Sequence, residues 1–121
     1  MSWKVKKGNT SIQDILVKDR DGNTVANLAS ATEIKLHIKT SETAAVASIT
    51  KLKTTGGIVV NTPSTGYLRI TLLPADTALT VAKYVMAIEI IWSDTSKYEC
   101  RIYIDNKETK TFEIEQDIVN T

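Results

Sequence analysis

The sequence contains little cysteine or histidine, and each shortage excludes a class of protein. Its one cysteine, Cys100, cannot form an internal disulfide, so a small disulfide-stapled scaffold is excluded. The one histidine, His37, and that cysteine cannot supply the nitrogen and sulfur ligands of a usual zinc site. A formal net charge of +1 gives no broad attraction to nucleic acid or to an anionic membrane, so we expect neither as a partner.

Long hydrophobic runs are also missing. No apolar stretch approaches the ~20 residues of a membrane span. Residues 1–7 carry charge but are not followed by the apolar stretch of roughly 7–15 residues that a signal peptide contains. We therefore expect neither a membrane span nor a signal peptide.

β-branched residues are abundant instead, and glycine and proline are scarce. Isoleucine (14), valine (9) and threonine (17) supply 40 of the 121 residues, against 5 glycines and 2 prolines. Branched side chains suit a pleated, half-buried surface and lose rotamer freedom in helices, so the composition favours strands. A chain of this length corresponds to one domain, and we expect residues 1–121 to form it.

Alternation of apolar and polar residues predicts the strands. The pattern is unbroken at 33–39 and recurs at 67–72 and at 112–118, where Gln116 is the one polar residue on the inward side. Residues 74–79 predict one helical turn, because a proline lies near its start. Shorter strands are expected around glycine-containing turns, at 11–18, 24–28, 46–52 and 58–60.

A central hairpin is predicted over 84–104, with a turn at its middle. Pairing Trp92 with Tyr98 sets one face of the hairpin inward and places Glu89 opposite Arg101 on the outer face. The inward residues are then Met86, Ile88, Ile90 and Trp92 with Tyr98, Cys100, Ile102 and Ile104. A shift by one residue would bury Glu89 at a cost of several kcal/mol, so the first register is favoured. Strands and turns at this spacing predict an all-β antiparallel β-sandwich of seven to eight strands.

Few residues suggest chemistry. His37 alternates with lysines on the polar side of its strand and is expected to be a solvated residue rather than a base or a metal ligand. Cys100 falls on the inward side of its strand, where a thiol is an inert apolar group. Residues 19–23 look like part of a calcium loop but lack its downstream glutamate, so a hairpin turn is favoured. We expect no catalytic residue, no metal and no cofactor.

Two rows of charge lie near the ends of the chain. Glu113, Glu115 and Asp117 alternate on one side of the last predicted strand and could hold a cation or form a solvated face. Lys4 and Lys6 alternate similarly near the start. If the first strand pairs beside the last, the two rows face each other.

The aromatic residues indicate an interaction surface. Trp3 and Tyr103 have no evident place in the core, and exposed aromatic residues often mark interfaces. The outer face of the central hairpin carries Val85, Ala87, Ile91 and Tyr103, which a loop of the same chain or a partner must cover. Trp3, Val85, Ile91 and Tyr103 are therefore the candidate partner-interface residues. Three aromatic side chains are expected in the core: Trp92, Tyr98 and Phe112.

A family resemblance spans most of the chain. It is carried by residues 7–10, the Asp21-Gly22 turn leading to Val25 and Leu28, residues 31–39 and 66–78, Tyr84-Val85 with Ile88, and Phe112-Glu113-Ile114 with Asp117-Ile118. Together these segments resemble the N-terminal immunoglobulin-like domain of phage baseplate upper proteins and related tail-fibre or virion-attached proteins. The turn at 74–78 and the strand led by Tyr84 are similar to the tyrosine corner of β-sandwiches, whose hydroxyl binds upstream backbone.

The resemblance implies an immunoglobulin-like fold and a structural role in a bacteriophage virion without catalysis. The domain would dock on other phage virion proteins at a baseplate, tail or neck, as a homo-oligomer, after assembly in the host cytoplasm. Members of that group continue into a coiled coil and a receptor-binding region. This sequence has no heptad run, so an adaptor, collar or decoration role is expected.

A second hypothesis is a carbohydrate-binding or adhesin-like β-sandwich. Sugar binding would require an exposed aromatic platform with polar groups nearby, and Trp3 or Trp92 would have to face solvent.

Overall fold

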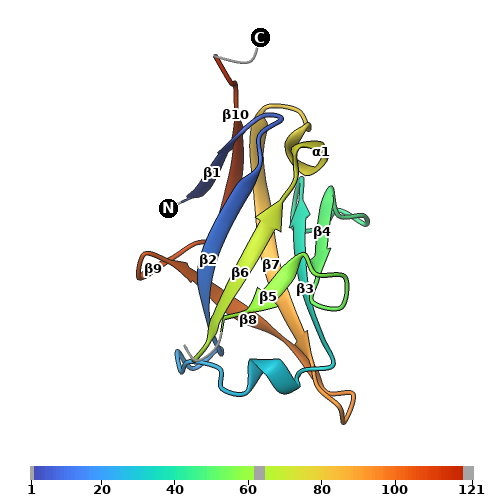
Figure 1. Ribbon diagram of the computed structural model, residues 1–121, viewed down its shortest axis with the longest axis vertical. Helices are drawn as coiled ribbons and strands as arrows, with labels where there is room; N and C mark the ends of the chain where they lie inside the picture. The colour runs from blue at the N-terminus through green and yellow to red at the C-terminus, as the bar shows by residue number, and fades with distance from the viewer. Residues whose placement is uncertain (1, 62–64, 119–121) are drawn as a thin grey trace.

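The computed structural model describes residues 2–61 and 65–118, which are mostly in β-strands (Figure 1). No helix within these residues is long and apolar enough to cross a membrane. The strands described are β1 (Ser2–Lys6), β2 (Ser11–Lys18), β3 (Glu33–Lys39), β4 (Ile49–Leu52), β5 (Ile58–Val60), β6 (Tyr67–Leu72), β7 (Ala82–Ile91), β8 (Lys97–Ile104), β9 (Lys107–Glu108) and β10 (Thr111–Glu115). The helical segments are η1 (Leu28–Ser30) and α1 (Pro74–Thr77).

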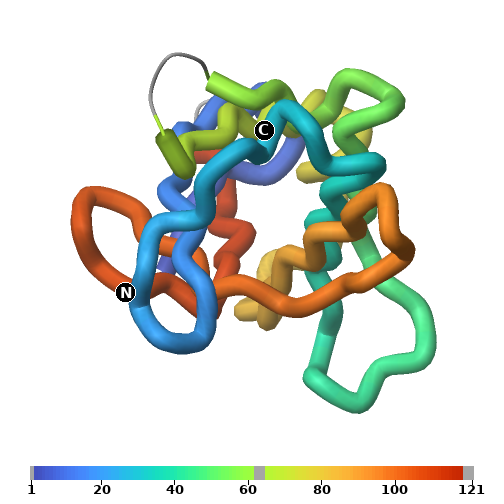
Figure 2. The backbone as a smooth tube through the Cα atoms, turned by 90° about the horizontal axis from the view of Figure 1, so that it is seen from below, coloured from blue at the N-terminus to red at the C-terminus, as the bar shows by residue number. Residues whose placement is uncertain are grey.

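The strands form one mixed sheet that does not close on itself. One set runs in the order β4, β3, β7, β10, β1, and the other in the order β5, β6, β2. β8 connects the two sets, because its first half pairs with β7 and its second half with β2. Figures 1 and 2 show β8 crossing from one set to the other.

The core is built from alternate residues, as the sequence pattern predicts. Ile34, Leu36 and Ile38 of β3 are at most 1% exposed, and their polar neighbours face outward. Buried residues of both sets belong to one hydrophobic cluster. Burying an isoleucine or leucine side chain contributes roughly 1.5–3 kcal/mol, so this cluster holds the two sets together.

The first and last strands pair in parallel, so the sheet is not purely antiparallel. Lys4 lies opposite Glu113, and Lys6 lies opposite Glu115 with its Nζ 3.4 Å from the carboxylate. The prediction that the two charge rows face each other is confirmed. Both partners of the second pair are about half exposed, so it contributes at most about 1 kcal/mol. Asp117 is buried and therefore does not extend the acidic row.

The predicted register of the central hairpin is wrong by two residues. Ile90, rather than Trp92, lies opposite Tyr98, and Glu89 faces Glu99 instead of Arg101. The turn explains the shift, because the Trp92 amide donates a hydrogen bond to the Ser96 carbonyl at 2.9 Å. A shift of two residues leaves every side chain on its predicted face, so burial does not oppose it. The observed register does place two carboxylates, Glu89 and Glu99, opposite each other, which is unfavourable.

Three further segments differ from the prediction. After the turn at Gly22, Thr24 forms only an isolated bridge with Lys18 and no strand follows. Val46 is 79% exposed and lies outside β4. The last strand ends at Glu115, and Ile118 is 84% exposed instead of facing inward. The helical turn at α1 and the bounds of β2, β3, β5 and β6 agree with the sequence prediction.

Candidate functional site

Trp3 is a core residue, so its expected exposure is wrong. It is 4% exposed, and its ring makes an edge-to-face contact with Phe112 at 5.2 Å between centroids. An aromatic pair of this geometry contributes about 0.5–1.5 kcal/mol beyond area burial. The signal was present in the sequence, since Trp3 and Val5 alternate with Lys4 and Lys6 as inward and outward residues of one strand.

The predicted interface patch on the hairpin does not form one surface. Val85, Ala87 and Ile91 are half-buried on the outer side of β7, where longer polar side chains of β3 lie beside them; His37, for example, is opposite Ala87. Tyr103 lies away from them, because β8 has left β7 at this point and pairs with β2. Whether Val85 and Ile91 contact a partner stays a prediction.

Tyr84 makes the hydrogen bond expected of it. Its hydroxyl donates to the Thr80 carbonyl at 2.7 Å, and the residue is 5% exposed. Burial raises the pKa of this phenol, because the charged form would be poorly solvated. Its ring packs edge-to-face against Phe112, so Tyr84 joins the start of β7 to the core. Of the other expected core residues, Trp92 is half-buried and Tyr98 is 37% exposed.

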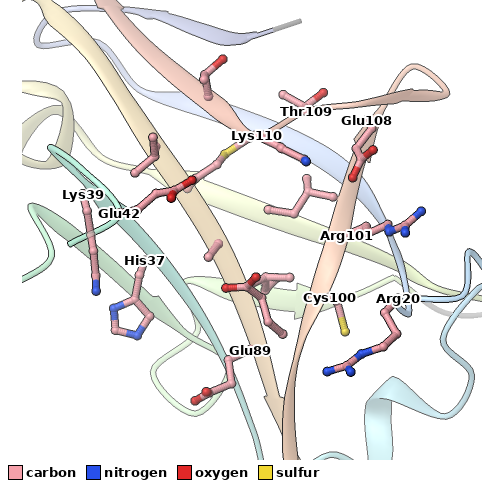
Figure 3. A pocket seen from close by; sticks show the side chains of 17 residues that line it. Arg20, His37, Lys39, Glu42, Glu89, Cys100, Arg101, Glu108, Thr109 and Lys110 are labelled. Carbon is pink, nitrogen blue, oxygen red and sulfur yellow. The ribbon is translucent and has the colours of Figure 1, made fainter. Parts of the chain in front are cut away.

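A hollow lies where β8 separates from β7 and the 108–111 segment closes the gap. Figure 3 shows His37 and Lys39 on one side of it and Arg101, Glu108 and Lys110 on the other. Burial and the nearby charges of Lys39 and Lys35 lower the pKa of His37 below its usual value. The imidazole is therefore neutral at pH 7 and above.

Cys100 also lines this hollow but lacks the character of a nucleophile. Burial, followed by the nearby charges of Asp19 and Glu99, raises the pKa of its thiol to about 11. Its strand position is inward, opposite Ile88, whereas His37 is on the outward side of β3. The two residues therefore do not form a cysteine–histidine pair. Among the residues the structure describes, no group of three acidic, histidine or cysteine side chains could hold a metal ion.

A different surface carries aromatic side chains that remain accessible. On the outward side of three neighbouring strands, Leu16 of β2 lies directly opposite both Tyr67 of β6 and Tyr103 of β8. Tyr67 is 36% exposed, and the other two are half-buried. We call Tyr67, Leu16 and Tyr103 the tyrosine row. It spans three strands, or about 10 Å, since paired strands lie about 4.8 Å apart.

Charged side chains flank the tyrosine row. Lys18 places its Nζ 4.5 Å from the centre of the Tyr103 ring, within the range of a cation–π contact. On the other side of the row, Asp14 accepts a hydrogen bond from Arg69 Nε at 2.9 Å, which holds the pKa of its carboxyl below the usual range. Both partners are about half exposed, so this pair lies on an open surface.

A shallow hollow next to the row is lined by both tyrosines and several polar groups. Its lining includes Asp14, Asp105 and Asn106. Asp105 and Asn106 form the tight turn between β8 and β9, and both have positive φ (52° and 63°), as two-residue hairpin turns of this kind require. The turn therefore brings two polar side chains to this surface.

The tyrosine row was not predicted from the sequence. The signal available was the alternation of Ile12, Asp14 and Leu16 on one face of residues 11–18. Assembling the row also requires the pairing of β2 with β6 and β8, which come much later in the chain.

No known protein-family model matches the chain, and no curated protein matches it in sequence.

Proposed function

We propose that the chain is an immunoglobulin-like β-sandwich. The two sets of strands support this: β4-β3-β7-β10-β1 would form one layer and β5-β6-β2 the other. The parallel pairing of the first strand with the last and the hydrogen bond from Tyr84 to Thr80 fit the same fold. β8 and β9 would then be an insertion between the last two strands of the first layer.

We further propose that the protein is a structural component of a bacteriophage virion, such as a baseplate, tail-fibre, collar or decoration adaptor. It acts by docking on other virion proteins and on further copies of itself, without catalysis, cofactor or metal. The tyrosine row is the observation that carries the docking role, because Tyr67 is 36% exposed and Leu16 and Tyr103 beside it are only half-buried. The resemblance of the sequence to virion-attached domains supplies the setting.

The test is to locate the protein in particles of the phage whose genome encodes it. An antibody raised against the purified chain should label one structural level of the particle, and the chain should co-purify with particles through a density gradient. A protein found only in the soluble fraction of the infected cell would overturn the proposal.

Two variants connect this test to the surface. Tyr67→Glu places a charge in the tyrosine row, and incorporation into particles should fall. Val46→Glu is the matched control, since Val46 is 79% exposed in a loop away from the row. Equal incorporation of the two variants would refute the role of this surface.

A carbohydrate-binding module is the second candidate, and the shallow hollow favours it. Of the platforms expected from the sequence, Trp3 is buried and Trp92 is half-buried. Tyr67 and Tyr103 with the Asp105-Asn106 turn offer apolar surface beside polar groups instead. Glycan-array binding that disappears in Tyr103→Ala would support this function over docking.

A further inference from the structure

Charges of opposite sign lie at equal distances on either side of the tyrosine row. On β2, Lys18 is two residues after Leu16 and Asp14 is two residues before it, all on the outward side. A strand rises about 3.4 Å per residue, so each charge lies about 7 Å from the row.

β8 repeats the arrangement in the same direction. Arg101 pairs with Lys18 on the outward side, next to the row. Asp105, two residues after Tyr103, lines the hollow together with Asp14 on the opposite side of the row. We call Lys18 and Arg101 the basic flank, and Asp14 and Asp105 the acidic flank. Arg69 of β6 also lies on the acidic side, hydrogen-bonded to Asp14, so that side carries two carboxylates and one guanidinium against two cations on the basic side.

We propose that this face is the contact surface of a symmetric dimer, occupied by a second copy of the same chain. A two-fold axis running along the tyrosine row turns the second copy over and reverses its strand direction. The tyrosine row of each copy then packs against the same row of its neighbour. The basic flank of each copy lies over the acidic flank of the other.

The charge pattern favours a second copy over an unrelated partner. A two-fold contact uses one patch twice, so each attraction between a basic and an acidic flank occurs twice. The apolar row lies between them, where side chains lose most of their water. The Asp14 side chain is still 44% exposed beside Arg69, so it can accept a further cation. Charge complementarity of this kind also fixes the orientation of the two copies.

This inference deepens the proposed function, on which it rests for its biological setting. It names one partner and the face that partner occupies, and it leaves the other surfaces for contacts with different virion proteins.

Sedimentation equilibrium of the full chain tests the dimer. We expect the mass to rise with concentration toward twice the 13.3 kDa of one chain. Added salt should weaken the association, because flank charges near the surface are screened. A mass that stays at one chain at the highest soluble concentration would overturn the inference.

Charge reversal gives a sharper test. Lys18→Glu with Arg101→Glu makes both flanks acidic, and Asp14→Lys with Asp105→Lys makes both basic. Each doubly substituted protein alone should dimerise at least about tenfold more weakly than wild type, since several exposed pairs change sign together. An equimolar mixture should form the heterodimer, because an acidic face then meets a basic one.

A matched control uses the same charge change on another face. Lys35→Glu with Lys39→Glu on the outward side of β3 should leave dimerisation unchanged. Circular dichroism of every variant should match that of the wild type. Failure of the two reversed proteins to combine, or equal weakening by the control, would refute the assignment.

The outcomes separate this inference from the proposed function. A chain that is monomeric in solution yet present in particles overturns the dimer and leaves the virion role standing. A chain that dimerises in solution but is absent from particles supports the dimer and overturns the virion role. A monomer that binds saccharides through Tyr103 assigns the face to a glycan and overturns the dimer.

Discussion

Alkaline pH should destabilise the protein through Cys100. The thiol is 6% exposed, and burial raises its pKa from 9.0 to about 11. In the unfolded chain the thiol ionises near its ordinary pKa, whereas the folded state keeps it protonated. Its contribution to stability is therefore complete below pH 9 and is lost as the pH rises toward 11.

The size of this loss follows from the two pKa values. Each pKa unit corresponds to about 1.4 kcal/mol, so the free energy of unfolding should fall by about 1.4 kcal/mol at pH 10 on account of this group alone. Above pH 11 the loss levels off at roughly 2.7 kcal/mol.

Alkaline pH also affects stability through other groups, so the measurement needs a variant that lacks the thiol. Urea unfolding of wild type and Cys100→Ala should be compared from neutral pH to about pH 10. The variant loses some packing at every pH, which gives a constant offset. The wild-type advantage should shrink by about 1.4 kcal/mol over this range. Parallel curves would refute the reasoning and show that the hollow admits enough water to solvate the thiolate.

Three further predictions concern single side chains, each measured by urea unfolding. Tyr84→Phe should lower the free energy of unfolding by about 1–2 kcal/mol, because it leaves the Thr80 carbonyl without its donor. Tyr98→Phe, at an exposed site, should lower it by less than about 0.5 kcal/mol. Equal losses would contradict the role of the Tyr84 hydroxyl. Trp3→Ala should cost about 3–5 kcal/mol, and a cost below about 1 kcal/mol would show that β1 adds little to the core. Gly66→Ala should lower the free energy of unfolding clearly more than Gly22→Ala. Both glycines have positive φ, but only at Gly66 would an added Cβ lie 2.3 Å from a neighbouring side chain. A larger loss for Gly22→Ala would contradict the packing described.

The faces of the strands could be predicted from the sequence, because burial acts on every second residue. β3 begins and ends at the predicted residues, and Ile88, Ile90 and Cys100 are buried as expected. The contact between Lys6 and Glu115 was predicted in the same way, because lysines alternate near the start of the chain and carboxylates alternate near its end.

Pairing partners could not be predicted in the same way. A two-residue slip in the hairpin leaves every face unchanged, so alternation cannot detect it. The turn decides the register, and it does so through Thr95, which adopts φ 69° without being glycine. Nothing in the pattern of β8 shows that the strand changes neighbours between Cys100 and Arg101. Tyr103 was for this reason assigned to the wrong surface.

The parallel pairing of β1 with β10 has a mechanical consequence. Because the two strands run the same way, tension applied at Ser2 and Glu115 pulls them past each other along their length. All of the backbone hydrogen bonds between them then bear load together, whereas antiparallel terminal strands would separate one bond at a time. A domain connected at these two points would resist stretching until the whole ladder broke at once.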